Sequence, residues 1–229
     1  MDPDHTHSPP PSPFAARDCA LISLATGLAA ENLREFRDAL LKVHEGSIYH
    51  HFWGRLLHAR FDEPEYLNDF ASWAYHALHE KALAERLSLI YPGDHPDLES
   101  LRHEVVEIVE QRLDESEQVP WAKADQLFYF VRARLVVFDT GIRVSEPREL
   151  AEVIPRLSTG SVYYHFIDAR RRTSEGCDDF TAWICAHSPD CPGLRDKLAA
   201  IDPYFSSLKE TRRRLGELFN AYYREGATR

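Results

Sequence analysis

Two histidines in this 229-residue chain occupy the same position in a repeated motif, which makes them the first candidates for chemistry. Residues 46–52 read G-S-I-Y-H-H-F and residues 160–166 read G-S-V-Y-Y-H-F, so five of seven positions are identical at an offset of 114 residues. Of the twelve histidines, only His51 and His165 share a repeat position. An imidazole can serve as a general base, as a metal ligand or as a hydrogen-bonded core residue. All three roles have to be weighed for this pair.

A carboxylate and a large aromatic side chain also recur downstream of each histidine. The segment D-F-x-x-W at residues 69–73 returns at residues 179–183. A carboxylate that binds one imidazole nitrogen fixes the tautomer and leaves the other nitrogen as a base or a metal ligand. We therefore expect each histidine to meet the aspartate of its own half between helices. The candidate ligand-binding residues are the polar and aromatic side chains shared by the two halves: Ser47, Tyr49, His51, Asp69, Trp73, Ser161, Tyr163, His165, Asp179 and Trp183.

The same side chains also suit a purely structural role. Gly46-Ser47 and Gly160-Ser161 are typical of a helix start with serine as the N-cap. Each histidine then follows four residues later, on the helix face that carries apolar side chains, where it can bind a backbone carbonyl or its aspartate. Tyrosine and tryptophan fill core volume as readily as they contact a sugar or another small polar ligand. The sequence leaves the structural and the ligand-binding roles open.

A metal site is a third hypothesis, and it concerns the first half of the chain only. Residues at i and i+3 share one face of a helix, as His76 and His79 would. With the histidines that follow Tyr49, they resemble the ligand sets of metal-binding helical bundles. The second half has no comparable cluster. The candidate metal ligands are His50, His51, His58, His76 and His79.

No catalytic signature accompanies these candidates. The sequence contains no P-loop, no G-x-G-x-x-G after a strand, no H-E-x-x-H and no G-x-S-x-G. It therefore predicts neither a catalytic residue nor a particular cofactor, and it leaves open whether the chain is an enzyme.

Composition limits the partners and the location. The net charge of −10 argues against a general nucleic-acid binder, which needs basic side chains to replace phosphate counterions. No apolar run approaches the ~18 residues that a membrane span requires. Residues 1–13 are rich in proline, histidine and aspartate and contain no apolar stretch typical of a signal peptide, so we expect a disordered tail and a cytoplasmic protein.

Similarity between the halves defines the expected architecture. Helical periodicity predicts short helices at about residues 81–90 and 194–201 and a long amphipathic helix at the end of each half. We expect a mainly α protein of two homologous helical subdomains from an internal duplication, with room for one short strand at the start of each copy. The predicted divisions are a tail at 1–13, repeat 1 at 14–115, a linker at 116–124 and repeat 2 at 125–229. A packed pair about a pseudo-twofold axis is favoured over two independent beads.

The combination of G-S-aliphatic-Y-x-H-F, a helix with N/D-D-F-x-x-W and an amphipathic C-terminal helix resembles a bacterial family named domain of unknown function 5752. The resemblance covers nearly the whole chain after the tail, in both halves. It implies no established activity. The leading hypothesis is therefore a non-enzymatic cytoplasmic binding or accessory protein whose partner is an unknown protein or small molecule, with no nucleic acid or membrane involved. The alternative is a histidine-dependent metal-binding protein or metalloenzyme.

Overall fold

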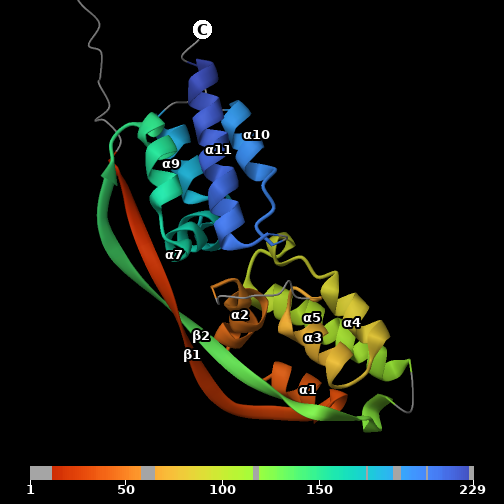
Figure 1. Ribbon diagram of the computed structural model, residues 1–229. Helices are drawn as coiled ribbons and strands as arrows, with labels where there is room; N and C mark the ends of the chain where they lie inside the picture. The colour runs from red at the N-terminus through yellow and green to blue at the C-terminus, as the bar shows by residue number, and fades with distance from the viewer. Residues whose placement is uncertain are drawn as a thin grey trace, which may run out of the picture. The chain divides into compact units, whose positions relative to one another are not determined.

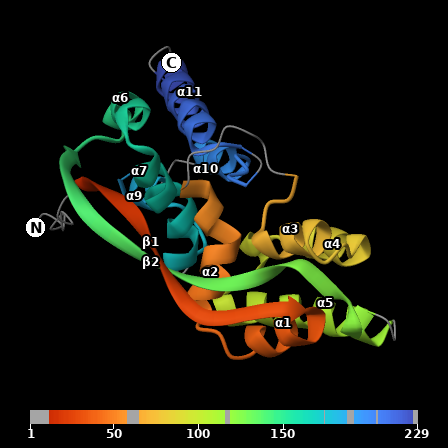
Figure 2. The ribbon, with the colours of Figure 1, turned by 60° about the horizontal axis from the view of Figure 1, so that its bottom comes forward.

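A computed structural model describes residues 12–57, 65–115, 119–173, 175–187, 192–204 and 206–226. These residues form an α+β fold in which two long antiparallel strands, β1 (Phe14–Asn32) and β2 (Lys123–Val144), run side by side as a ribbon (Figures 1 and 2). The expectation of a mainly α protein with one short strand per copy is therefore wrong. The tail predicted at residues 1–13 lies almost entirely outside the described residues.

The strands continue through glycines, which usually interrupt or distort a strand. Gly27 and Gly141 lie inside the strands with φ of 78° and 76°, a conformation that glycine adopts without strain. Alternation of buried and exposed residues also slips by one between Ala16 and Cys19. Such irregularities are typical of β-bulges, and they hide the period of two by which a strand is recognised.

The chain divides into two compact units, and each unit takes part of both strands. Unit 1 contains residues 1–19 and 137–229, and unit 2 contains residues 20–136. Each helical set therefore packs on strand segments that come from both halves of the sequence. The predicted subdomain boundaries and the pseudo-twofold packing stay predictions.

Unit 2 contains the helices of the first half, which lie on one side of its ribbon segment (Figure 1). They are α1 (Leu33–Leu40), α2 (Glu45–Trp53), α3 (Asp69–His76), α4 (Lys81–Ser88) and α5 (Leu98–Asp114), with the 3-10 turns η1 (Gly54–Leu57), η2 (Pro92–Asp94) and η3 (Val119–Trp121). Asn32 and Asp97 cap α1 and α5 by accepting backbone hydrogen bonds. The core is aromatic: the ring of Phe36 stacks on Trp73 at 4.9 Å and meets Phe128 edge-on at 5.1 Å.

Unit 1 contains the helices of the second half. They are α6 (Leu150–Val153), α7 (Thr159–Val162), α8 (Ala169–Arg172), α9 (Asp179–His187), α10 (Pro192–Ala199) and α11 (Leu208–Gly226), with the 3-10 turns η4 (Pro147–Glu149) and η5 (Ile154–Arg156) and the π-helical turn η6 (Tyr163–Asp168). Helix α11 packs on α6, η5 and α7 and buries Leu215 and Phe219 completely. No helix of the described part of the chain is long and apolar enough to cross a membrane.

Candidate functional site

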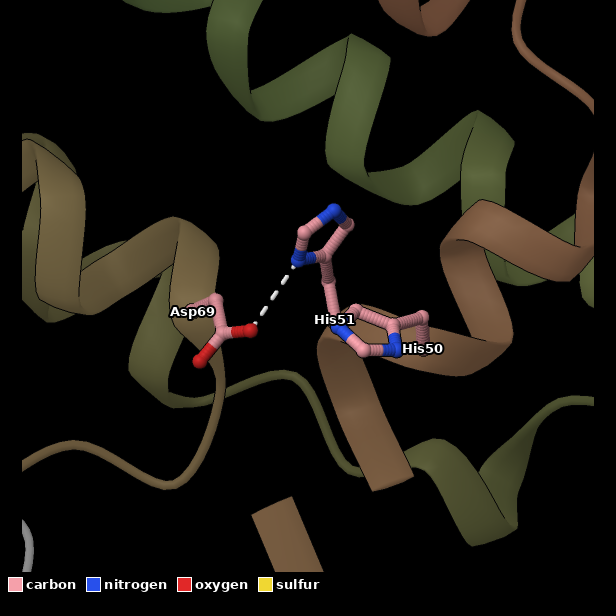
Figure 3. A group of neighbouring side chains, drawn as sticks. All are labelled: His50, His51 and Asp69. Atoms are coloured by element: carbon pink, nitrogen blue, oxygen red, sulfur yellow. Dashed lines mark hydrogen bonds and ion pairs between the residues drawn. The ribbon is translucent and has the colours of Figure 1, made fainter. Parts of the chain in front are cut away.

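The two shared histidines are buried between a helix and the ribbon. His51 lies in α2 of unit 2, and His165 lies in η6 of unit 1; each residue is 3% exposed. His51 Nδ1 is 3.0 Å from Asp69 Oδ2. A dashed line marks this contact in Figure 3. His165 Nδ1 is 2.7 Å from Asp179 Oδ2. The structure thus brings together both histidine–aspartate pairs that the sequence predicts.

The second nitrogen of each ring binds the backbone of a strand. In unit 2 the backbone N–H of Val131 donates to His51 Nε2 at 3.2 Å. In unit 1 the backbone N–H of Arg17 donates to His165 Nε2 at 2.8 Å. We call each arrangement of aspartate, histidine and strand N–H a histidine clamp.

The hydrogen-bond directions in a histidine clamp fix the chemical state of the imidazole. An amide N–H can only donate, so Nε2 must present its lone pair. The ring proton of a neutral imidazole then resides on Nδ1, where it donates to the aspartate. Protonation of Nε2 would set two donors against each other. In this state neither nitrogen is available as a general base or as a metal ligand.

The two clamps are related by the same spacing as the motif. Arg17 and Val131 are 114 residues apart, as are His51 and His165. A residue in the first half of β2 therefore binds a helix of the first half of the chain, and a residue near the start of β1 binds a helix of the second half.

Two further hydrogen bonds also join a helix of one half to the backbone of the other half. Trp73 Nε1–H donates to the carbonyl of Gln126, and Trp183 Nε1–H donates to the carbonyl of Ser12, both at 2.8 Å. The two acceptors are again 114 residues apart. Each shared tryptophan thus binds the backbone of the other half, Trp73 within β2 and Trp183 just before β1.

A break in strand alternation explains why an amide is available to each histidine. Around His51, Phe128 and Phe130 are buried, and the inward positions then shift to Ala133 and Leu135. The equivalent shift on β1 lies between Ala16 and Cys19. A bulge leaves backbone groups without ladder partners, and a buried amide without a partner costs roughly 1–3 kcal/mol. The histidine removes that cost.

Arginines balance the aspartates, but they come from different positions in the two units. Arg55 Nε lies 3.1 Å from Asp69 Oδ1 in unit 2. In unit 1, Arg172 Nη2 lies 3.0 Å from Asp179 Oδ2, and Arg172 also pairs with Asp168. Each aspartate therefore has an arginine partner in addition to the imidazole N–H.

The shared serines and tyrosines are buried beside the clamps. Ser47 Oγ–H donates to the carbonyl of Val131 at 3.0 Å, whereas Ser161 receives a bond from Ser158. The prediction that the two shared serines cap their helices is wrong. His44 accepts the N–H of Gly46 at the start of α2, and Ser158 accepts the N–H of Ser161 at the start of α7.

The tyrosines fill volume against helix residues. The ring of Tyr49 stacks on Trp53 at 5.3 Å, and Tyr163 is fully buried. Each histidine ring also packs on a strand phenylalanine, His51 on Phe128 at 4.7 Å and His165 on Phe14 at 4.8 Å. The shared tyrosines and histidines therefore lie within the packed cores of the two units.

The proposed metal ligands gather only in part. Among the described residues, His50, His51 and Asp69 each offer a ligand atom within 4.8 Å of the others (Figure 3). His76 instead pairs with Glu65 and His79 with Asp125, both at exposed positions. His58 lies outside the described residues. A metal on His51 Nδ1 would shift the ring proton to Nε2 and break the bond from Val131, so the clamp opposes metal binding there.

Sequence reasoning missed the strand amides and a buried pair of helix caps. Asn68 precedes α3, accepts the N–H of Ala71 and donates to the carbonyl of Leu87. Asp178 has the same position before α9 and binds Thr181 through its N–H and its hydroxyl. Burial raises the pKa of the Asp178 carboxyl, because it disfavours the charged form. The N/D-D-F-x-x-W pattern already contains these caps as its first position.

Comparison with known proteins identifies the family of this chain. A model of a family of unknown function, DUF5752, matches residues 11–220. The chain belongs to this family. A solved structure described as OrfY from Thermoproteus tenax has a TM-score of 0.78 and 27% identity, over 92% of this chain and 95% of that chain. That organism is an archaeon, so the match does not bear out the bacterial origin implied by the resemblance. No curated protein matches the chain.

The clamps predict a specific stability loss. His51→Ala and His165→Ala each remove one bond to a half-buried aspartate and one to a strand amide, so we expect each to lower the free energy of unfolding by about 3 kcal/mol. His76→Ala is the control, because an exposed ion pair contributes little, and we expect a change within about 0.5 kcal/mol. Urea unfolding followed by circular dichroism measures the three values. Equal, small effects for all three variants would contradict the structural role of the clamps.

Exchanging aspartate and asparagine at the two buried helix caps, Asp178 and Asn68, should change the melting temperature in opposite directions in the two units, and the change should depend on pH. The raised pKa of Asp178 means that its stabilising contribution is present below the unfolded-state pKa and is lost as the pH rises through the folded-state pKa. Asp178→Asn removes this loss, so it should raise the melting temperature, and more so at pH 8 than at pH 4. The mirror variant Asn68→Asp should lower it at pH 8, because aspartate cannot donate to Leu87. Thermal unfolding at both pH values tests the pair; a lower melting temperature for Asp178→Asn at pH 8 would refute the account.

Proposed function

We propose that this chain is a non-enzymatic binding or accessory protein and that its contact surface is the ribbon of unit 2. The helices of that unit lie on one side of its ribbon segment (Figure 1). We define the outer face by the exposed residues on the other side: Ala20, Ile22, Ala25, Gly27, Ala29, Leu127, Tyr129, Arg132, Arg134 and Val136. We also infer two internal copies, which the recurrence of contacts at the 114 offset supports. A cytoplasmic location is part of the same proposal.

The structural role of the two shared histidines supports this proposal. Both nitrogens of His51 and of His165 are engaged in hydrogen bonds. The most conspicuous repeated residues therefore explain how strands and helices are held together and leave no activated base. A role in binding then has to come from a surface.

The observation that carries the proposal is the apolar character of the outer face. β1 has no charged residue between Asp18 and Glu31, although its alternate residues are exposed. On the neighbouring strand, Tyr129 is 64% exposed and Leu127 41%. Solvent-facing and edge strands normally carry charged side chains that prevent association. An exposed face to which one strand contributes only uncharged residues, as β1 does here, is typical of an interaction site.

Site-specific photocrosslinking in cells tests this surface. We expect a benzophenone amino acid in place of Tyr129 to form discrete covalent adducts, because the outer face is covered by the partner. Leu89 provides the matched control: it is an apolar residue of unit 2 that is 82% exposed and follows α4. The absence of discrete adducts at position 129, or the same adducts at position 89, would refute the ribbon as the contact surface.

A histidine-dependent metal-binding protein or metalloenzyme is the alternative, and the proximity of His50, His51 and Asp69 favours it. The tautomer required by Val131 opposes it, so we expect less than about 0.1 equivalent of zinc, nickel or manganese on tag-free protein after dialysis. Elemental analysis of the wild type and of His50→Ala measures this. About one metal per chain, lost in His50→Ala, would overturn the binding-protein proposal in favour of the metal site.

A further inference from the structure

Two arginines in the middle of the outer face indicate what kind of partner fits it. Resting on the proposed function, we propose that the partner is a protein segment that combines apolar side chains with carboxylates and sets these carboxylates against Arg132 and Arg134. Its apolar side chains would pack on the neighbouring exposed residues, chiefly Ile22 and Tyr129. The inference concerns unit 2 alone.

The two arginines differ from the other charged residues of β2. Lys123 pairs with Glu31, Asp125 with His79, and Asp139 with Arg143. Arg132 and Arg134 are exposed, and neither forms an ion pair with another residue that the structure describes. The alternation slips between Phe130 and Ala133, so beyond the slip Arg132 and Arg134 are exposed while Ala133 is partly buried. Both guanidinium groups therefore belong to the outer face.

The adjacent strand offers these arginines no carboxylate in its stretch between Asp18 and Glu31. The chain carries a net charge of −10, yet β1 presents only uncharged residues between Asp18 and Glu31. A guanidinium group binds a carboxylate through two parallel hydrogen bonds, and this geometry adds specificity as well as energy. Two such groups surrounded by apolar residues therefore match a partner that supplies acidic and apolar side chains together.

Other occupants match this face less well. In a symmetric dimer the same patch would meet itself, so four guanidinium groups would face a surface without carboxylates. Nucleic acids and anionic membranes present negative charge over a wide area, and the net charge of −10 repels them. A protein segment can place one or two carboxylates locally while it covers the apolar residues.

Crosslinking in charge variants tests the partner's chemistry. The benzophenone residue at position 129 is combined with the double variant Arg132→Glu/Arg134→Glu, or with Arg132→Gln/Arg134→Gln. The control is Lys42→Glu/Lys81→Glu, which makes the same change of charge at exposed positions outside the ribbon of unit 2. Circular dichroism and thermal unfolding confirm that each variant folds.

We expect adduct yield to fall about tenfold in the glutamate variant, less in the glutamine variant, and not at all in the lysine control. Mass spectrometry of the adduct should identify a peptide with aspartate or glutamate next to apolar residues. Adducts that persist equally in all variants, or that join two copies of this chain, would overturn the acidic partner while leaving the ribbon as a contact surface. If the benzophenone at position 129 forms no adduct even when Arg132 and Arg134 are unchanged, the proposed function itself is refuted.

Discussion

A hydrogen bond from a strand amide to a histidine Nε2 is the interaction on which the rest of this structure depends. It occurs once in each unit, from Val131 to His51 and from Arg17 to His165. The strand is irregular at these points, and an amide left without a partner inside a packed core would destabilise the fold by roughly 1–3 kcal/mol. The aspartate that contacts each histidine keeps the ring proton on Nδ1 and so leaves the lone pair of Nε2 for the amide. The clamp therefore needs all three groups: aspartate, histidine and strand N–H.

The clamps also connect the two halves of the sequence. Each helical set binds strand residues that begin the other half, and the tryptophan bonds follow the same rule. A chain built this way has no half whose helices and strand suffice for its own core. The residues that recur in both halves are therefore explained by how the fold is held together, whereas the internal comparison does not mark the outer face of the unit 2 ribbon, which is the surface proposed for binding.

Sequence reasoning recovered the helices and the pairing of each histidine with its aspartate, because both follow from local spacing. Helix α3 contains the D-F-x-x-W segment as predicted, and α4 and α10 lie close to the expected 81–90 and 194–201. The strands were underestimated because Gly27 and the slips in alternation conceal a period of two. The strand amides could not be predicted, since a backbone group has no signature in the sequence and the contact joins residues 80 and 148 positions apart.

The tautomer of the two clamp histidines tests the central claim most directly. Long-range ¹H–¹⁵N correlation spectra of histidine-labelled protein at neutral pH report which ring nitrogen carries the proton. We expect His51 and His165 both to carry the ring proton on Nδ1 and to leave Nε2 unprotonated. A proton on Nε2 in either ring, or rapid averaging in both, would contradict the clamp and reopen the roles of base and metal ligand.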